Sequence, residues 1–438
     1  MTTGDDWQRL HPLTPVLRGW RILLVAVAAF GQQGLRQQEG FNALYLGLGV
    51  LAATLFGTAL SFLSWRRTRY RLTATELQID SGILQRRSRR VPLARLQAVD
   101  VVRPVVARVL GLAELRLEVV GGAGKAEAPL AYLSEEHAHA LRGRLLAAAA
   151  GRDGDAAAEV HEGVLVRVPT GTLVASVLLG TPILATAVLV LVLGVVTVMQ
   201  SGAALPVALA ALPTYAGVIT LSGRRVLQEY GFTVAEAPDG LRLRHGLLDT
   251  RSQTIPAGRV QAIRVLEPLL WRPFGWARVE VDVAGYGGGR SEEQAATSAL
   301  LPVAPRALAH ALVGRVLGRA LPVAAAPVPS RARWRAPLSR RRLQVGLDHN
   351  HLVTTHGVLT TTTDVVPLTK IQSLRLTSGP WQHWLRLATL HADTAGRRLS
   401  GAVGAHRDVY EARALLDEVA RRSRAHRAKE TTEQIGQP

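Results

Sequence analysis

Two kinds of hydrophobic pattern divide the chain. Residues 41–65 and 172–223 contain no charged side chain, and both runs exceed the roughly 20 residues that cross a bilayer core. Residues 19–30 form a shorter apolar run that contains Arg21 and ends at the sequence GQQG. A polar turn, QSG at 200–202, divides the longest run. We therefore predict two transmembrane helical hairpins, at residues 18–65 and 172–223.

The remaining segments alternate apolar and polar residues with a period of two, as over residues 70–79. This alternation predicts half-buried antiparallel strands. Further strand patterns recur at 110–120, 274–284 and 385–395. Each is followed by a helix start or an apolar helical face: Ser134, Glu135 and Glu136; Pro305; and Val409, Ala412, Leu416 and Val419. The pattern predicts three β-rich modules that each end in a helix.

One nine-residue segment occurs three times along the chain. It reads VPLARLQAV at 91–99, IPAGRVQAI at 255–263 and VPLTKIQSL at 366–374. A glycine stands ten positions before the proline in every copy, which makes the chain a threefold repeat. The repeated residues are Gly82, Pro92, Arg95 and Gln97; Gly246, Pro256, Arg259 and Gln261; and Gly357, Pro367, Lys370 and Gln372.

These repeated residues have two interpretations. In the structural one, the glycine occupies a turn with positive φ, the proline lies at a strand start or bulge, and the glutamine bonds to the backbone at a strand bend. In the functional one, the repeated cation contacts a ligand. A residue repeated in a repeated fold is more often structural, so we favour the first interpretation and keep the second as the alternative.

The segments are expected to follow one another as tail, hairpin, module, linker, hairpin, module, linker, module and tail. Their predicted bounds are 1–17 (N-terminal tail), 18–65 (transmembrane hairpin 1), 66–150 (module 1), 151–171 (linker), 172–223 (transmembrane hairpin 2), 224–320 (module 2), 321–338 (Pro/Ala/Arg linker), 339–425 (module 3) and 426–438 (disordered tail). Arginines flank the predicted spans, whereas the loops inside the hairpins hold only Arg36. The positive-inside rule then places both termini and all three modules in the cytoplasm.

The segment from Tyr70 to Leu117 carries the pattern YxLTxxxLxIxxGxLxRRxxxVPLxRLQxVxVxxxxxxRxLGLAxLxL. It resembles the bacterial pleckstrin-homology-like (PH-like) domain of the YdbT-type family of membrane proteins. The resemblance implies an α+β membrane protein: two transmembrane helical hairpins plus three PH-like small β-barrel modules, each closed by a C-terminal helix. It implies no established catalytic residues. The third copy departs from the pattern, because Arg386 replaces the glycine and threonines at 360–363 replace arginines.

The chain is strongly basic, with 52 Lys and Arg against 33 Asp and Glu and a formal net charge of +19. Such a balance favours a polyanionic neighbour such as the inner leaflet of a membrane. The candidate lipid-facing residues are Arg66, Arg67, Arg69, Arg86, Arg87, Arg89 and Arg90 in module 1, and Arg331, Arg333, Trp334 and Arg335 before module 3. Topology bias, a solvated face or a plain charged linker would explain the same residues.

Signals for catalysis and for cofactors are missing from the sequence. It has no cysteine, and the glycine-rich stretches at 121–126 and 285–290 lack the features of a phosphate-binding loop. His349 and His351 fall in a turn and His356 lies beside Gly357, so they do not predict a metal site. We therefore predict no enzyme, no catalytic residue, no cofactor and no metal.

The predicted function is a non-enzymatic scaffold or accessory protein of the bacterial plasma membrane, multi-pass, with three cytoplasmic modules. Its predicted partners are anionic lipid headgroups and a partner membrane protein, in homo- or hetero-oligomers, with envelope stress or antimicrobial-peptide defence as a candidate setting. A small-solute transporter or channel component is the alternative, disfavoured because the uncharged runs lack ionisable side chains. No nucleic-acid partner is predicted, since no reader motif is present.

Overall fold

The computed structural model describes residues 7–15, 43–73, 75–82, 86–93, 96–119, 130–149, 163–201, 204–237, 240–256, 258–283, 299–318, 326–395 and 401–435. They form two compact units. The first contains Met1–Val160 and Leu248–Gln253, and the second contains His161–Leu247 and Thr254–Pro438. The first unit therefore holds module 1, and the second holds module 3 and most of module 2.

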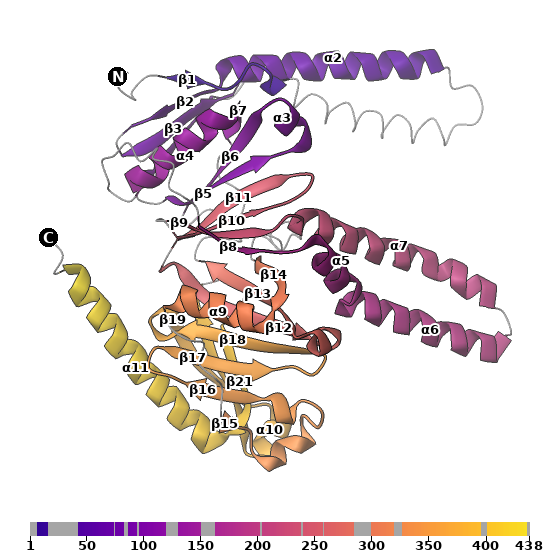
Figure 1. Ribbon diagram of the computed structural model, residues 1–438, viewed down its shortest axis with the longest axis vertical. Helices are drawn as coiled ribbons and strands as arrows, with labels where there is room; N and C mark the ends of the chain where they lie inside the picture. Colours follow the sequence, from indigo (N-terminus) through magenta and orange to yellow (C-terminus); the bar gives the residue numbers. More distant parts are fainter. Residues whose placement is uncertain are drawn as a thin grey trace. The chain divides into compact units, whose positions relative to one another are not determined.

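Module 1 consists of two antiparallel sheets (Figure 1). The first has the order β1-β2-β3-β4, with bounds Gln8–Arg9, Arg69–Leu72, Glu76–Ser81 and Arg87–Pro92. The second contains β5 (Leu96–Arg103), β6 (Leu112–Val119) and β7 (Leu130–Ser134), with helix α3 (Val105–Val109) after β5. Helix α4 (Glu135–Ala149) buries Leu141 and Leu145 in the same core as Tyr70, Leu77 and Leu115. Helix α2 (Ala43–Arg67) leads into β2.

Module 2 repeats this order of elements. Strands β8 (Gly163–Arg167), β9 (Thr233–Ala237), β10 (Gly240–His245) and β11 (Thr250–Pro256) come first. Strands β12 (Val260–Pro268), β13 (Trp276–Val283) and β14 (Ala299–Pro305) follow, with the 3-10 helix η2 (Leu269–Phe274) after β12 and helix α9 (Arg306–Leu317) at the end. Helices α5 (Thr170–Leu178), α6 (Thr181–Ser201) and α7 (Ala204–Glu229) lie between β8 and β9.

Module 3 has the same plan in a shorter form. Its first strands are β15 (Ala326–Pro327), β16 (Gln344–Leu347), β17 (His351–His356) and β18 (Thr360–Pro367), followed by η5 (Leu368–Lys370). Strands β19 (Ile371–Thr377), β20 (Leu387–Thr394) and β21 (Ala402–Asp408) form the second sheet, with helix α10 (Pro380–Trp384) after β19. Helix α11 (Val409–Ile435) closes the module, and the 3-10 helices η3 (Ser330–Trp334) and η4 (Arg340–Arg342) lie between β15 and β16. The predicted closing helices are thus present in all three modules.

An insertion separates the first two strands of every module. In modules 1 and 2 it contains long helices, α2 in one and α5 to α7 in the other, whereas in module 3 it contains η3 and η4. The helices are therefore inserted into the modules rather than placed before them. By this correspondence, the segment 328–343 occupies in module 3 the place that helices α5 to α7 occupy in module 2. We call α6 and α7 the helix pair.

The barrel expected for each module is not closed in the described residues. Instead, the outer edge of β12 pairs with β18 of module 3, which makes one sheet of order β14-β13-β12-β18-β17-β16-β15. In the first unit, the outer edge of β5 pairs in the same way with Thr250–Ser252 of β11. A strand that already has two neighbours has no free hydrogen-bonding groups for closing a barrel within its own module.

A salt bridge crosses the pairing of β12 with β18. Arg264 lies opposite Asp364, and its Nε donates to Oδ1 of that carboxylate at 2.6 Å. Burial raises the pKa of Asp364, while the bond from Arg264 opposes this change. The two residues are 100 positions apart in the chain, so this contact belongs to the joint between modules 2 and 3.

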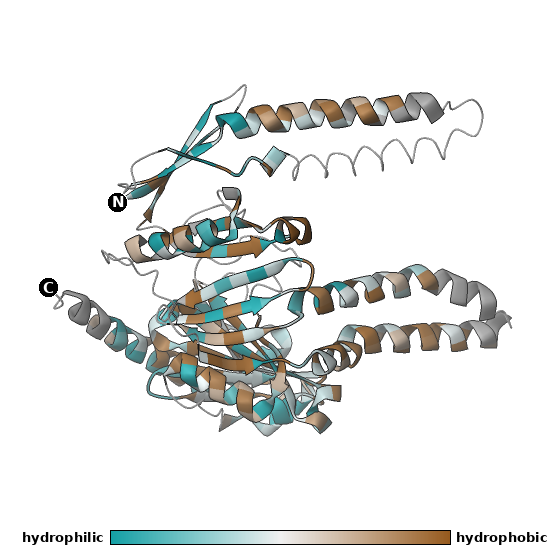
Figure 2. Cartoon of the chain, turned by 45° about the horizontal axis from the view of Figure 1, so that its top comes forward, coloured by the Kyte–Doolittle hydropathy of each residue, from teal (hydrophilic) through white to brown (hydrophobic). Residues whose placement is uncertain are grey.

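The predicted membrane hairpins are seen in part. Helices α6 and α7 lie side by side and project from module 2 (Figure 1), and the described parts of α2, α6 and α7 are largely hydrophobic (Figure 2). Within the described residues, the stretch Thr170–Val196 is long and apolar enough to cross a membrane, and only 6% of its most apolar 18 residues are buried. The first arm of hairpin 1 lies outside the described residues. The presence of two spanning hairpins stays a prediction.

Three segments expected to be tails or linkers are folded. Residues 7–15 supply β1 and bury Leu10 in the core of module 1. In the expected linker 321–338, Val328, Ala332 and Ala336 form a small core with Leu387. Helix α11 continues to Ile435, well into the expected disordered tail. In the first two segments the apolar residues are few, and their contacts are with residues distant in the sequence, so no local pattern marks them as folded.

The glycines of the repeat lie in turns with positive φ, as predicted. Gly357 has a φ of 94° between β17 and β18. Nineteen residues after the repeat prolines, Gly111 and Gly275 have φ values of 66° and 63°, and Arg386 keeps this conformation with a φ of 49°. The backbone shape of the turn is thus retained in module 3 without glycine. The prolines differ from expectation, because Pro92, Pro256 and Pro367 end strands β4, β11 and β18 instead of opening the next ones.

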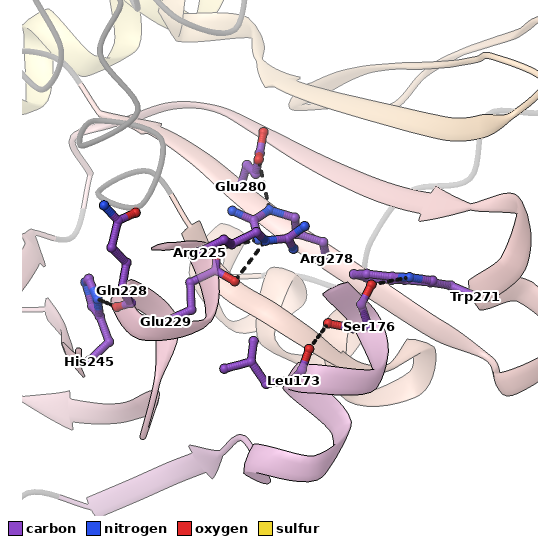
Figure 3. A network of polar contacts seen from close by, with 9 residues as sticks. All are labelled: Leu173, Ser176, Arg225, Gln228, Glu229, His245, Trp271, Arg278 and Glu280. Atoms are coloured by element: carbon purple, nitrogen blue, oxygen red, sulfur yellow. Dashed lines mark hydrogen bonds and ion pairs between the residues drawn. The ribbon is translucent and has the colours of Figure 1, made fainter. Parts of the chain in front are cut away.

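A buried polar network attaches the helix pair to module 2 (Figure 3). Glu229, at the end of α7, accepts from Arg278 Nη1 at 2.7 Å and from Arg225 Nε at 3.1 Å. Arg278 also bonds to Glu280 at 3.0 Å. Burial alone would raise the pKa of Glu229, but the guanidinium groups of Arg278 and Arg225 outweigh it and the pKa is lowered. The network therefore holds a charged carboxylate at the junction.

Trp271 of η2 forms a second attachment. Its side chain is 1% exposed and its Nε1 donates to the carbonyl oxygen of Ser176 in α5 at 3.0 Å (Figure 3). His245 adds a third, with Nδ1 donating to the carbonyl oxygen of Gln228 at 2.7 Å. Both ends of the inserted helices are thus bonded to strands and turns of module 2.

We predict that Gly357→Ala destabilises the protein more than Gly275→Ala does. Both glycines have positive φ, which costs an alanine about 1 to 2 kcal/mol. A Cβ on Gly357 would also overlap the carbonyl oxygen of Thr360, whereas a Cβ on Gly275 would meet no atom within 4 Å. We expect losses of about 3 kcal/mol and about 1 kcal/mol, respectively, in the free energy of unfolding. Denaturant titration in detergent, followed by tryptophan fluorescence, measures both, and equal losses would contradict the overlap.

We also predict that Glu229→Gln lowers the free energy of unfolding by about 3 kcal/mol at neutral pH, because it leaves the buried Arg278 undercompensated. Since the folded pKa of Glu229 lies below its ordinary value of 4.5, its contribution is present above pH 4.5. The contribution is lost as the pH falls through the folded pKa. The difference between wild type and variant should therefore shrink in acid. Unfolding curves across pH 3 to 8 test this, and a difference independent of pH would refute it.

Candidate functional site at the base of the helix pair

The repeated cations and glutamines do not form a common site in the described residues. Gln261 donates from Nε2 to the carbonyl oxygen of Arg259 at 3.2 Å, which is the backbone contact expected at the bend. Gln372 is exposed on β19, and Lys370 is half-buried in η5. Arg95 and the side chain of Gln97 lie outside the described residues.

The basic cluster of module 1 does not share one face. Cross-strand partners lie on the same face of a sheet, and Ile79 lies opposite Arg89 while Gln78 lies opposite Arg90. Arg87 and Arg89 are therefore on the side of the buried Leu77 and Val91, and Arg69 and Arg90 are on the opposite side. Arg66 and Arg67 end α2, and Arg86 precedes β4. All seven are exposed.

The second basic stretch has a mixed role. Arg331 donates from Nε to the carbonyl oxygen of Leu385 at 2.9 Å and forms an ion pair with Asp408, so it holds η3 to the body of module 3. Trp334 is 71% exposed, with the guanidinium of Arg333 5.2 Å from its ring centroid. Arg333, Trp334 and Arg335 are therefore available at the surface, whereas Arg331 is structural.

A group of exposed apolar side chains, which we call the apolar rim, lies near the start of α6. It consists of Leu269 and Phe274 of η2 and Leu359 of the turn before β18, which are 43%, 57% and 59% exposed. The amide of Leu269 donates to the carbonyl oxygen of Leu359 at 2.6 Å. Next to Leu359, the hydroxyl of Thr360 lies 3.4 Å from the hydroxyl of Thr181 at the start of α6. These exposed side chains thus lie where an apolar helix leaves the module.

Two arginines meet beside this rim. Arg272 of η2 donates from Nη2 to the carbonyl oxygen of Val358 at 2.8 Å and to Thr361 Oγ1 at 2.9 Å. Arg342 of η4 donates from Nη1 to the same Thr361 Oγ1 at 2.6 Å. We call Arg272 and Arg342 the arginine pair. It brings together η2 of module 2 and the insertion of module 3.

The two guanidinium groups of the arginine pair repel each other. Burial and the guanidinium of Arg342 lower the pKa of Arg272. Nε of Arg272 is buried and has no hydrogen-bond partner among the described residues. Glu267 acts on Arg272 at a distance, but its ion pair is with Arg306 at 2.9 Å. Two guanidinium groups on one hydroxyl are a suitable receptor for a phosphate, whose oxygens accept several charge-assisted bonds.

Sequence reasoning did not identify this pair as a site. Arg342 belongs to the basic run 340–342, but Arg272 is a single arginine in an apolar segment, and nothing in its neighbourhood marks it. Its partner is 70 positions away in another module, so no local spacing could connect them. In the described part of the chain, no group of three His, Cys, Asp or Glu could hold a metal ion.

Comparison with known proteins agrees with the repeated architecture. The family model described as "Bacterial PH domain" matches three times, at residues 22–149, 164–320 and 307–423. The UPF0699 transmembrane protein YdbT of Bacillus subtilis (strain 168) is 24% identical over 292 residues, which are 59% of this chain and 57% of that relative. The chain thus matches little more than half of the length of this relative. No solved structure matches the chain. The three matches, which together cover nearly all of its length, show that the chain belongs to the bacterial PH domain family.

Proposed function

We propose that this chain is a multi-pass protein of the bacterial plasma membrane and a non-enzymatic scaffold. Its modules lie against the cytoplasmic membrane surface, where the arginine pair binds the phosphate of anionic lipids. The observation that carries the proposal is the convergence of Arg272 and Arg342 on Thr361, beside the apolar rim at the start of α6. The membership in a bacterial PH domain family and the similarity to a transmembrane protein support it.

The length of α6 gives the depth of the site. The helix has 21 residues, or about 30 Å at roughly 1.5 Å per residue, which equals the thickness of a hydrocarbon core. If α6 spans that core, its first residue lies at headgroup level. Thr181 contacts Thr360, so the turn with Leu359 and the arginine pair lie at the same level.

The two parts of the site complement the two parts of a lipid. Each arginine near an anionic surface contributes roughly 1 kcal/mol, and a phosphate held by both would also relieve the repulsion between them. The leucine and phenylalanine side chains of the apolar rim can enter the boundary between headgroups and acyl chains. The exposed Trp334 belongs to the insertion of module 3, and tryptophan is enriched at that depth.

A scaffold role fits the way the modules are connected. Modules 2 and 3 share one sheet, and the network around Glu229 and Arg278 fixes the helix pair to module 2. A lipid bound at the arginine pair would contact both modules at once. The modules would then present one surface of constant shape to a partner membrane protein.

We predict that Arg272→Gln/Arg342→Gln greatly reduces retention of anionic lipid. Native mass spectrometry of the full-length protein, purified in mild detergent and supplied with phosphatidylglycerol or phosphatidylcholine, measures the lipids that remain bound. Wild type should retain phosphatidylglycerol, and the double variant should lose most of it. Arg421→Gln/Arg424→Gln, which removes two exposed arginines of α11, is the control with the same charge change. Equal retention by both double variants would show that total charge, and not this pair, binds the lipid.

We further predict that residue 359 contacts the membrane. The chain has no cysteine, so Leu359→Cys and Gln372→Cys each give one labelling site for an environment-sensitive dye. In nanodiscs, the dye at 359 should shift its emission to the blue and be quenched by spin-labelled lipid, whereas the dye at 372 on β19 should report water. A dye at 359 that is quenched no better than the one at 372 would place the apolar rim away from the bilayer.

A further inference from the structure

The first strand of the second sheet is the joining strand of each module. In module 1 it is β5, which pairs with Thr250–Ser252, and in module 2 it is β12, which pairs with β18. The register is the same at both joints. Val101 lies opposite Ser252, and the corresponding Val265 lies opposite Thr363. The joining strands therefore use one repeated geometry to accept the strand that carries the next repeat proline.

Module 3 has a joining strand without such a partner. Strand β19 pairs with β20, and no strand pairs with its other edge in the described part of the chain. Gln261 and Ala262 of β12 are buried, whereas the corresponding Gln372 and Ser373 of β19 are exposed. The edge of β19 thus corresponds to a paired edge in the other two modules, but it has no partner strand in the described part of the chain. Exposed edges of this kind are templates for adding a strand.

The charge on β19 indicates what kind of strand it would accept. Arg264 of β12 bonds to Asp364 across the joint, and Arg375 is its counterpart in β19. The Arg375 side chain is 59% exposed and bonds to Asp393 of the neighbouring strand at 3.1 Å. A carboxylate opposite Arg375 would reproduce the pair found at the joint between modules 2 and 3.

A second copy of this chain is a poor candidate for this position. In the described part of module 1, β4 also has an edge without a partner strand, in the sheet β1-β2-β3-β4. In the register of the two joints, Arg89 of β4 would lie opposite Arg375, and like charges directly opposite each other destabilise a sheet. The exposed arginines of β4 instead resemble the charges that protect an edge from pairing.

We propose that the free edge of β19 binds a strand of another membrane-associated protein, namely a strand of the β18 type from a bacterial PH module with a carboxylate opposite Arg375. The bound strand would run antiparallel to β19 and continue the sheet. This inference deepens the scaffold role proposed above by naming the partner's recognition element. It does not depend on lipid binding, so the two can fail separately.

The test uses a peptide with the sequence of His351–Pro367, which contains the hairpin β17–β18 and Asp364. Fluorescence polarisation measures its binding to the full-length protein in detergent without anionic lipid. We expect saturable binding with a Kd on the order of 0.1 mM, and at least tenfold weaker binding of the peptide with Asp364→Lys. Arg375→Glu in the protein should reverse this preference. Because Arg264 is unchanged in that variant, a reversal locates the peptide at β19.

Three outcomes would overturn the proposal. They are the absence of saturable binding up to about 1 mM, equal binding of both peptides, and a preference that Arg375→Glu leaves unchanged. Self-association of the wild-type protein that Arg375→Glu abolishes would also overturn it, because the occupant would then be a second copy. Arg375→Gln is the matched variant for folding. Its unfolding midpoint should equal that of wild type, and it should lose the preference for either peptide.

Discussion

The hydrogen-bonding groups along the edge of a strand are the constraint on which this architecture depends. An unpaired buried N–H or C=O costs about as much as a lost hydrogen bond, so a sheet must close on itself, cover its edges or add a strand. Here β12 adds β18, and β5 adds the start of β11. This pairing explains why the modules do not close as barrels, and why copies of one segment recur at a constant position relative to the joints.

Charged side chains, and not backbone pairing, join the helix pair to module 2. A buried ion pair is costly to desolvate and strongly destabilising to break, so it contributes geometry more than stability. Glu229 is the last residue of α7, and its contact with Arg278 connects that helix to the centre of a strand. Trp271 connects η2 to α5 through a single hydrogen bond to the carbonyl oxygen of Ser176. These contacts fix the ends of α7 and α5 that lie against module 2.

Local sequence patterns predicted the strands, turns and helices. The contacts that join the modules and form the site connect residues far apart in the chain, and local patterns did not predict them. The repeat glycines could be assigned to turns because positive φ is a property of one residue and its neighbours. Arg386 shows the limit of such reasoning, since it keeps the turn without the glycine that signals it. The contacts of Arg264 with Asp364 and of Arg272 and Arg342 with Thr361 join segments far apart in the chain, and no sequence period links them. Thus the modules were predictable, whereas the joints and the arginine pair were not.

The arginines of this basic chain have several different roles in the structure. Arg331 and Arg278 are bonded within the fold, the arginines of β4 stand at an open strand edge, and the arginine pair lies beside the apolar rim. A single basic face would have predicted binding that depends on total charge. In this arrangement the site depends on geometry. Arg272 and Arg342 lie 2.9 Å and 2.6 Å from one hydroxyl, and moving either η2 or η4 would separate them. The site therefore requires the joint between modules 2 and 3, because the pairing of β12 with β18 brings η2 to Thr361.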